Sequence, residues 1–211
     1  MGANRGQIAF RPGDVIGFSS RDPIGRAINC GTWGMPYLKL LAGDFWGVSR
    51  WGLSHVGIVA GFPGTPDYMI LWESTSLLKA PCCLQGRVVS GVQAHLLDGR
   101  IGTYLGDVYQ YPLAKPLTPG EGLDLTAFLN SLLGRPYDTW GAVQARDMPL
   151  AEVYQRFHGE DLGSLFCSEL VVAALEKVGR WERTNASAYN PNMLHRHGMK
   201  RGIFSGRRRL Q

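Results

Sequence analysis

The sequence predicts a single α+β domain in which a curved antiparallel sheet comes first and helices follow. Short Val- and Ile-rich segments, separated by turns that contain Gly and Pro, fill the chain up to residue 114. After Pro119 the apolar residues change to a helical spacing. The chain has 211 residues, of which 45% are hydrophobic and 18% charged, and this composition is typical of one folded domain with a real core.

The predicted strands are identified by their β-branched residues and by the turns between them. The first follows the turn at Pro12 and Gly13, and the next two flank the turn PGTPD and form an antiparallel hairpin. Two more strands complete a curved antiparallel sheet. The predicted strand ranges are residues 13–20, 54–62, 68–75, 91–99 and 106–114.

Three helices are predicted in the second half. The first spans residues 122–134 and ends at Gly134, and the second is a short helix within residues 135–146. The third has the sequence SLFCSELVVAALEKVG, residues 164–179, with Ser164 as a plausible N-cap and Gly179 as the stop. The third helix therefore places a cysteine near its start.

The net charge of +5 arises at the C-terminal end of the sequence. Residues 196–211 hold six of the 22 Lys and Arg residues and no acid, which leaves 16 basic against 17 acidic residues elsewhere. We therefore divide the chain into a domain of residues 1–195 and a basic tail of residues 196–211. The tail either is merely solvated or binds nucleic acid or anionic lipid, with four candidate contacts: Arg201, Arg207, Arg208 and Arg209.

The sequence contains no apolar run long enough to span a membrane and no secretory signal at its start, so we expect a cytoplasmic protein. The cysteines do not follow the spacing of a disulfide framework, which favours a reducing compartment. No cofactor is expected. A metal site built from Cys82, Cys83, His195 and His197 lacks the usual ligand spacing.

Cys167 has two interpretations. It is a small buried core residue, as free cysteines often are. Alternatively, it is a nucleophile, because a thiol in the first turn of a helix meets unpaired N–H groups and the positive end of the helix dipole. The second interpretation requires a base and a group that orients the base.

His55 and Glu73 are the candidates for these two roles. His55 opens the strand HVGIVAG, so its ring can emerge at a sheet edge. Glu73 follows apolar Leu71 and Trp72 near the end of the adjacent predicted strand, where a carboxylate is costly unless it has a partner. The other interpretation of Glu73 is an ordinary surface glutamate at a strand end.

Together these segments resemble the circularly permuted branch of the NlpC/P60 papain-like superfamily, which includes the bacterial YiiX/YaeF-like amidases and a poxvirus homologue. The resemblance lies in GDVIGF, SHVGIVAG, WES and GRPYDTWG followed by FCSELV, with GVQAHLLDGRI, GDVYQYPL and NPNML as further matches. It covers roughly residues 11–195. His55 precedes Cys167 here, which is the order of the permuted branch and the reverse of ordinary papain-like enzymes.

The resemblance implies a papain-like cysteine hydrolase or acyltransferase. Cys167 would be the nucleophile, His55 the base and Glu73 the orienting acid, and the backbone N–H of Cys167 would meet the oxyanion. The target would be an amide, ester or thioester bond, attacked through an acyl-cysteine intermediate. Peptidoglycan peptides and lipid-like N-acyl compounds are the substrate classes that the family suggests.

Substrate contacts are expected from three aromatic residues, namely Trp51, Trp72 and Tyr137. The aromatic-rich segment 31–53 is either core or a lid over a substrate groove. The alternative to an enzyme is a structural or anchoring module of a virus or phage particle, in which the basic tail contacts nucleic acid. A virion location belongs to that alternative.

Overall fold

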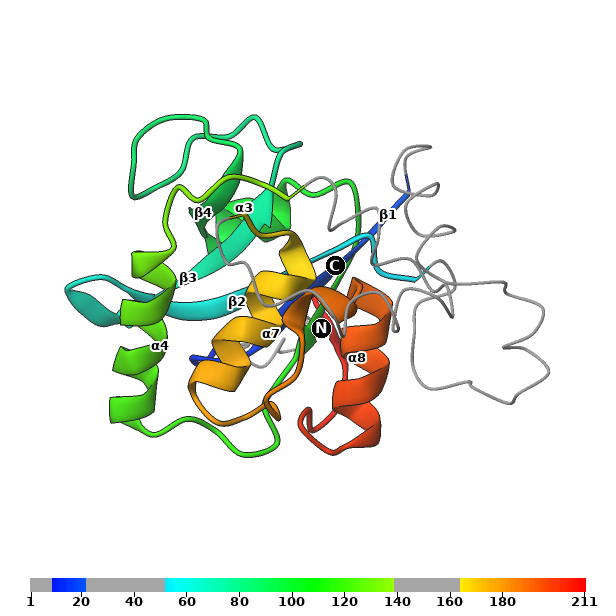
Figure 1. Cartoon of the computed structure of the whole chain (residues 1–211). Helices are drawn as coiled ribbons and strands as arrows, with labels where there is room; N and C mark the ends of the chain where they lie inside the picture. The colour runs from blue at the N-terminus through cyan, green and yellow to red at the C-terminus, as the bar shows by residue number, and fades with distance from the viewer. Residues whose placement is uncertain (1–8, 22–51, 139–163) are drawn as a thin grey trace, which may run out of the picture.

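The computed structural model describes residues 9–21, 52–138 and 164–211 (Figure 1). Its sheet is antiparallel and has six strands in the order β4-β3-β2-β1-β5-β6. The strands are β1 (Val15–Ser20), β2 (His55–Phe62), β3 (Thr65–Thr75), β4 (Gly91–Leu96), β5 (Gly106–Tyr111) and β6 (Arg208–Arg209). The helices are α3 (Leu97–Gly102), α4 (Pro119–Ser131), α7 (Cys167–Lys177), the short 3-10 helix η1 (Ala186–Ala188) and α8 (Pro191–Lys200). The α+β class with an antiparallel sheet is confirmed.

Alternate strand residues face two separate hydrophobic clusters. Ile58 and Trp72 belong to the larger cluster, which α4 and α7 cover, and in Figure 1 these two helices lie over the same face of the sheet. Val59 and Leu71 belong to a smaller cluster on the other face, where Leu97 of α3 also packs. Both faces of the sheet are therefore covered, and the ends of the strands are left for a site.

Three predicted strand boundaries are wrong by three residues each, and one of them is the end of β5, which lies at Tyr111 rather than at residue 114. The β2–β3 hairpin closes through a tight turn, so β3 begins at Thr65 rather than at residue 68. Gly64 allows this turn because its φ of +82° is in the left-handed region that favours glycine. The strand predicted to reach residue 99 ends at Leu96, and the chain turns into α3.

The predicted helices also differ in detail. The α4 helix begins at Pro119, where Thr118 and Glu121 form a capping box. The short helix predicted within residues 135–146 is absent from residues 135–138, and the remainder of it lies outside the described residues. Phe166, not Ser164, is the N-cap residue of α7, so Cys167 is the first helical residue. None of the helices in the described ranges is long and apolar enough to span a membrane.

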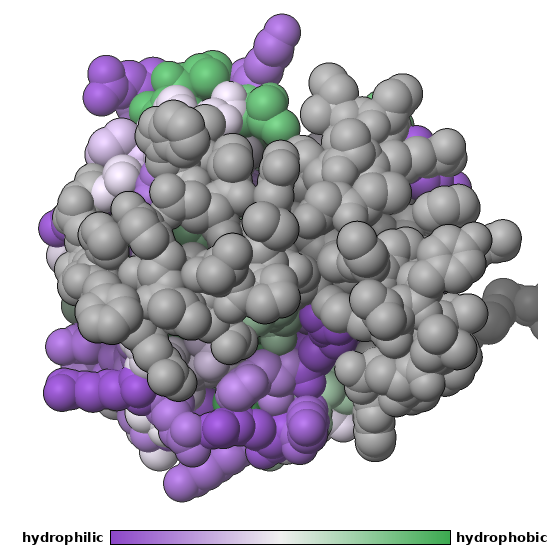
Figure 2. All heavy atoms as spheres, turned by 45° about the vertical axis from the view of Figure 1, so that its right-hand side comes forward, coloured by the Kyte–Doolittle hydropathy of each residue, from purple (hydrophilic) through white to green (hydrophobic). Residues whose placement is uncertain are grey.

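Residues 196–211 are integrated into the fold rather than forming a separate tail. The proposed boundary at residue 195 falls inside α8, Phe204 is buried against Tyr111, and β6 pairs with β5. Figure 2 shows hydrophilic side chains along the lower part of the molecule, the level at which α8 ends in Figure 1. We predicted a tail from the charge composition alone, and charge composition carries no information on which backbone segments pair. Binding of nucleic acid or anionic lipid by this segment stays a prediction.

We expect Gly198→Ala to destabilise the protein by about 1–3 kcal/mol, the usual cost of overpacking a core. A Cβ on Gly198 would lie 2.2 Å from a ring carbon of Phe204. Gly120→Ala is the matched control, because a Cβ on this α4 residue has no neighbour within 4 Å. Urea denaturation measures both variants. Equal stability of Gly198→Ala and wild type would show that the C-terminal segment does not pack as described.

Candidate active site

His55 and Glu73 are brought together by the β2–β3 hairpin. His55 is the first residue of β2, and Glu73 lies near the end of the antiparallel β3. The His55 Nε2 atom lies 2.6 Å from Glu73 Oε2, and Glu73 is fully buried. A carboxylate with no access to water requires partners of this kind.

Arg100 is the second partner of Glu73, and sequence reasoning missed it. Its Nε donates to Glu73 Oε1 at 2.8 Å and its Nη2 donates to Oε2 at 3.2 Å, in the two-pronged geometry that guanidinium and carboxylate favour. The guanidinium carbon lies 4.5 Å from the centre of the Phe18 ring and 5.4 Å from that of Tyr104. The two rings therefore hold Arg100 beside Glu73.

Cys167 completes this group from the start of α7. It is buried, with 5% of its surface exposed, and it lies close enough to His55 to raise the pKa of that histidine. The segment before it is anchored to β3, because the Ser74 hydroxyl donates to the carbonyl of Leu165 at 2.5 Å. As the first residue of α7, Cys167 has a backbone N–H without an intrahelical partner. The structure thus brings together the three residues that the sequence singled out.

The protonation of the pair follows from these contacts. Burial by itself disfavours the charged imidazole of His55, but the hydrogen bond and charge of Cys167, and then those of Glu73, raise the pKa of His55 to about 9. Burial also opposes ionisation of Glu73, but His55 and then Arg100 lower the pKa of Glu73 to about 2. Near neutral pH the pair is therefore an imidazolium and a carboxylate.

Two further contacts fix the backbone beside the site. Glu169 is buried and accepts the Phe166 N–H at 3.3 Å, which caps the start of α7. The side chain of Asn192, at the start of α8, accepts the N–H of Leu53 at 2.7 Å and donates to its carbonyl at 3.2 Å. Leu53 lies two residues before His55, so Asn192 holds the entry into β2.

The polar network extends from Glu73 into β4. Gln93 and Glu73 are register partners, and Gln93 hydrogen-bonds to His95 Nε2 at 2.9 Å. His95 Nε2 lies 3.9 Å from Glu73 Oε1, and burial lowers the pKa of His95. His95 is therefore a buried, neutral neighbour of the pair near neutral pH.

The three predicted substrate contacts have different outcomes. Trp72 is fully buried in the larger cluster. Adjacent residues of a strand point to opposite faces of the sheet, so Trp72 and Glu73 lie on opposite faces of β3. Trp72 is not available to a substrate. Tyr137 is half-buried and close enough to Cys167 for the cysteine's charge to raise the pKa of Tyr137, after the larger effect of burial. Trp51 lies outside the described residues.

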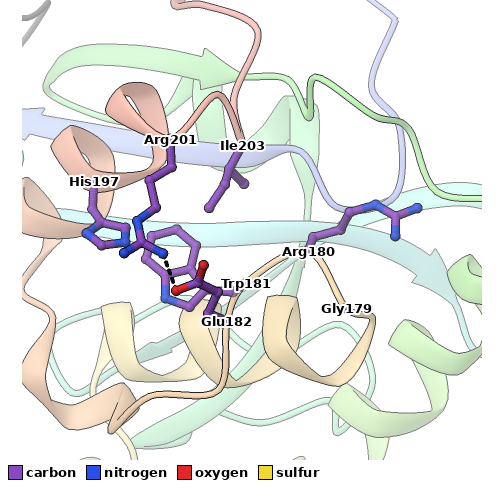
Figure 3. Close-up of a pocket in the computed structure, with 7 residues that line it drawn as sticks. All are labelled: Gly179, Arg180, Trp181, Glu182, His197, Arg201 and Ile203. Carbon is purple, nitrogen blue, oxygen red and sulfur yellow. Dashed lines mark ion pairs between the residues drawn. The ribbon is translucent and has the colours of Figure 1, made fainter.

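A separate hollow of about 450 Å³ lies between the C-terminal ends of α7 and α8. Figure 3 shows Arg180 pointing away from the other lining side chains and Arg201 paired with Glu182. It is one helix length, roughly 16 Å, from Cys167, so it is not part of the site. Within the described ranges, no group of three or more His, Cys, Asp or Glu residues is arranged to hold a metal ion.

Comparison with known proteins gives a distant structural similarity. No protein-family model matches the chain, and no curated protein matches it significantly. The chain is similar to the crystal structure of the metalloprotein YiiX from Escherichia coli O157:H7, with 14% identity and a TM-score of 0.49 over 95% of this chain and 96% of that chain. A similarity this distant assigns no activity.

Proposed function

We propose that the protein is a cysteine hydrolase or acyltransferase that attacks an amide, ester or thioester bond. One observation carries this proposal: a buried cysteine at the start of a helix lies close enough to a histidine to raise its pKa, and a buried carboxylate holds that histidine. Nucleophile, base and orienting group in this arrangement are the parts that nucleophilic catalysis by a thiol requires.

Acylation would begin with the thiolate of Cys167 and the imidazolium of His55. The sulfur attacks the carbonyl carbon, and the electron pair of the C=O bond moves to the oxygen. The N–H of Cys167, which has no partner within α7, would stabilise that oxyanion. When the tetrahedral adduct collapses, the bond to the leaving group breaks, and His55 gives its proton to the departing nitrogen, oxygen or sulfur.

Deacylation uses the same histidine in the opposite sense. Neutral His55 takes a proton from water, or from the amine or alcohol of an acceptor, while the oxygen or nitrogen attacks the thioester. The bond to Cys167 Sγ breaks, and the thiolate and imidazolium are regenerated. Water as the attacking group gives a hydrolase, and another acceptor gives an acyltransferase. Peptidoglycan peptides or lipid-like N-acyl compounds are the substrates that the family resemblance favours.

The test is the acyl intermediate itself. We expect p-nitrophenyl acetate to add one acetyl group to wild-type protein after an acid quench, with peptide mapping by mass spectrometry placing the group on Cys167. Cys167→Ser should lose the adduct. Cys83→Ser is the control, because Cys83 is partly exposed and burial raises its pKa, so it should contribute little. Acetylation spread evenly over several cysteines would contradict the proposal and favour a non-catalytic module.

A further inference from the structure

Glu73 has more positively charged partners than a simple nucleophile–base–acid arrangement requires. It accepts a hydrogen bond from His55 and two from Arg100, and its Oε2 atom is shared between them at 2.6 and 3.2 Å. The Arg100 side chain is only 10% exposed, and Glu73 is not exposed at all. The His55–Glu73 interaction is therefore part of a buried charge triad that Arg100 completes.

The charge count of this triad changes when His55 loses its proton. With imidazolium present, Arg100, His55 and Glu73 carry a net charge of one positive unit. When His55 is neutral, Arg100 and Glu73 still balance each other. Without Arg100, proton loss from His55 would leave the Glu73 carboxylate buried and uncompensated, which is strongly unfavourable.

We propose that Arg100 is a positioning residue that aims the Glu73 carboxylate at His55 and supplies the counter-charge that remains when His55 gives up its proton. The inference rests on the proposed function, because it concerns the half of the cycle in which His55 must be neutral. In the acyl-enzyme, sulfur is esterified and carries no charge. The balance between the two forms of His55 then depends on Glu73 and Arg100.

The neighbouring groups are consistent with this role for Arg100. Titratable side chains near the pair in the described residues include Cys167 from α7, His95 from β4, and Tyr104, Tyr137 and Asp138 from connecting segments. Burial lowers the pKa of His95, so this histidine is not a fixed cation near neutral pH. Arg100 is permanently charged, since guanidinium does not lose its proton in proteins.

The experiment follows the proton of His55 directly. Histidine side chains labelled with ¹⁵N are titrated by NMR in the Cys167→Ala background, which reproduces the charge of the acyl-enzyme, and His55→Gln assigns the signal. We expect Arg100→Gln to raise the midpoint of the His55 titration by about one pH unit, the effect of one nearby charge. Arg100→Lys retains the charge and should restore the midpoint to within a few tenths of a unit.

Arg180→Gln is the matched control. Arg180 also pairs with a glutamate, at 2.7 Å with an 11% exposed side chain, but at the far end of α7. It should leave the His55 midpoint unchanged.

Arg100→Met replaces Arg100→Gln if the latter fails to fold, as judged by circular dichroism. An unchanged or lowered midpoint in the uncharged variant, or a rise in Arg100→Lys as large as in Arg100→Gln, would overturn the inference. Failure of the proposed function would instead appear as absence of acyl-Cys167, which this titration does not measure.

Discussion

Replacing His55 by alanine is expected to lower the rate of acetyl transfer from p-nitrophenyl acetate through Cys167 by about 10²–10⁴-fold, the usual contribution of a positioned acid–base group. His55 is the histidine whose pKa Cys167 raises, so the variant has no base for the thiol proton and none for the attacking water. Rapid-quench measurement of the acyl adduct reports the acylation rate alone and so separates the effect on acylation from the effect on deacylation. Steady release of p-nitrophenol measures both.

His197→Ala is the control for this experiment. His197 lies on α8, and its ring packs against that of Trp181 at a centroid distance of 5.0 Å, away from the candidate site. It should acylate and turn over as wild type does. A His55→Ala variant that is folded, by near-UV circular dichroism, and transfers acetyl at the wild-type rate would remove His55 from the mechanism.

Glu73→Ala is expected to lower the free energy of unfolding by about 3–5 kcal/mol, the typical cost of removing one partner from a buried ion pair. The loss arises because the Arg100 guanidinium, with 10% of its side chain exposed, would remain without its carboxylate. Urea denaturation at neutral pH measures it. The double variant Glu73→Leu with Arg100→Met removes both charges and should recover much of the stability, although not the orientation of His55.

Glu121→Ala provides the comparison. This glutamate pairs with Arg180, but its side chain is 33% exposed, so solvent takes the place of the lost partner. We expect a clearly smaller loss than for Glu73→Ala. Similar losses in the two variants would mean that the charges around Glu73 are not energetically buried.

His55 and Glu73 could be predicted because the relevant rules are local. A histidine that opens one strand and an acid near the end of the next meet across a hairpin, whatever the remainder of the fold does. Arg100 could not be predicted from sequence. A buried carboxylate requires a partner, but nothing local says that the chain leaves β4 early and turns into a short helix that carries this arginine to Glu73.

Two wrong predictions from the sequence, the substrate contact of Trp72 and the separate C-terminal tail, have identifiable causes. Strand alternation, applied to Glu73 and Trp72, would have placed the tryptophan on the face opposite the carboxylate, where the structure has it. The C-terminal segment was assigned as a tail from its arginines, whereas Phe204 and the β5–β6 pairing decide its place. Pairing between distant segments leaves little trace in a single sequence, so this part of the fold required the structure.

The Asn192–Leu53 contact has a consequence for the order of folding. It spans 139 positions along the chain, whereas the His55–Glu73 contact spans only 18 and lies within one hairpin. Closing a long loop costs more chain entropy, so contacts of this kind form late. A growing chain folds from its N-terminal end first. It can therefore pair His55 with Glu73 before Cys167 has been synthesised. The thiol then enters a prepared site, and the reactive combination exists only once folding is nearly finished.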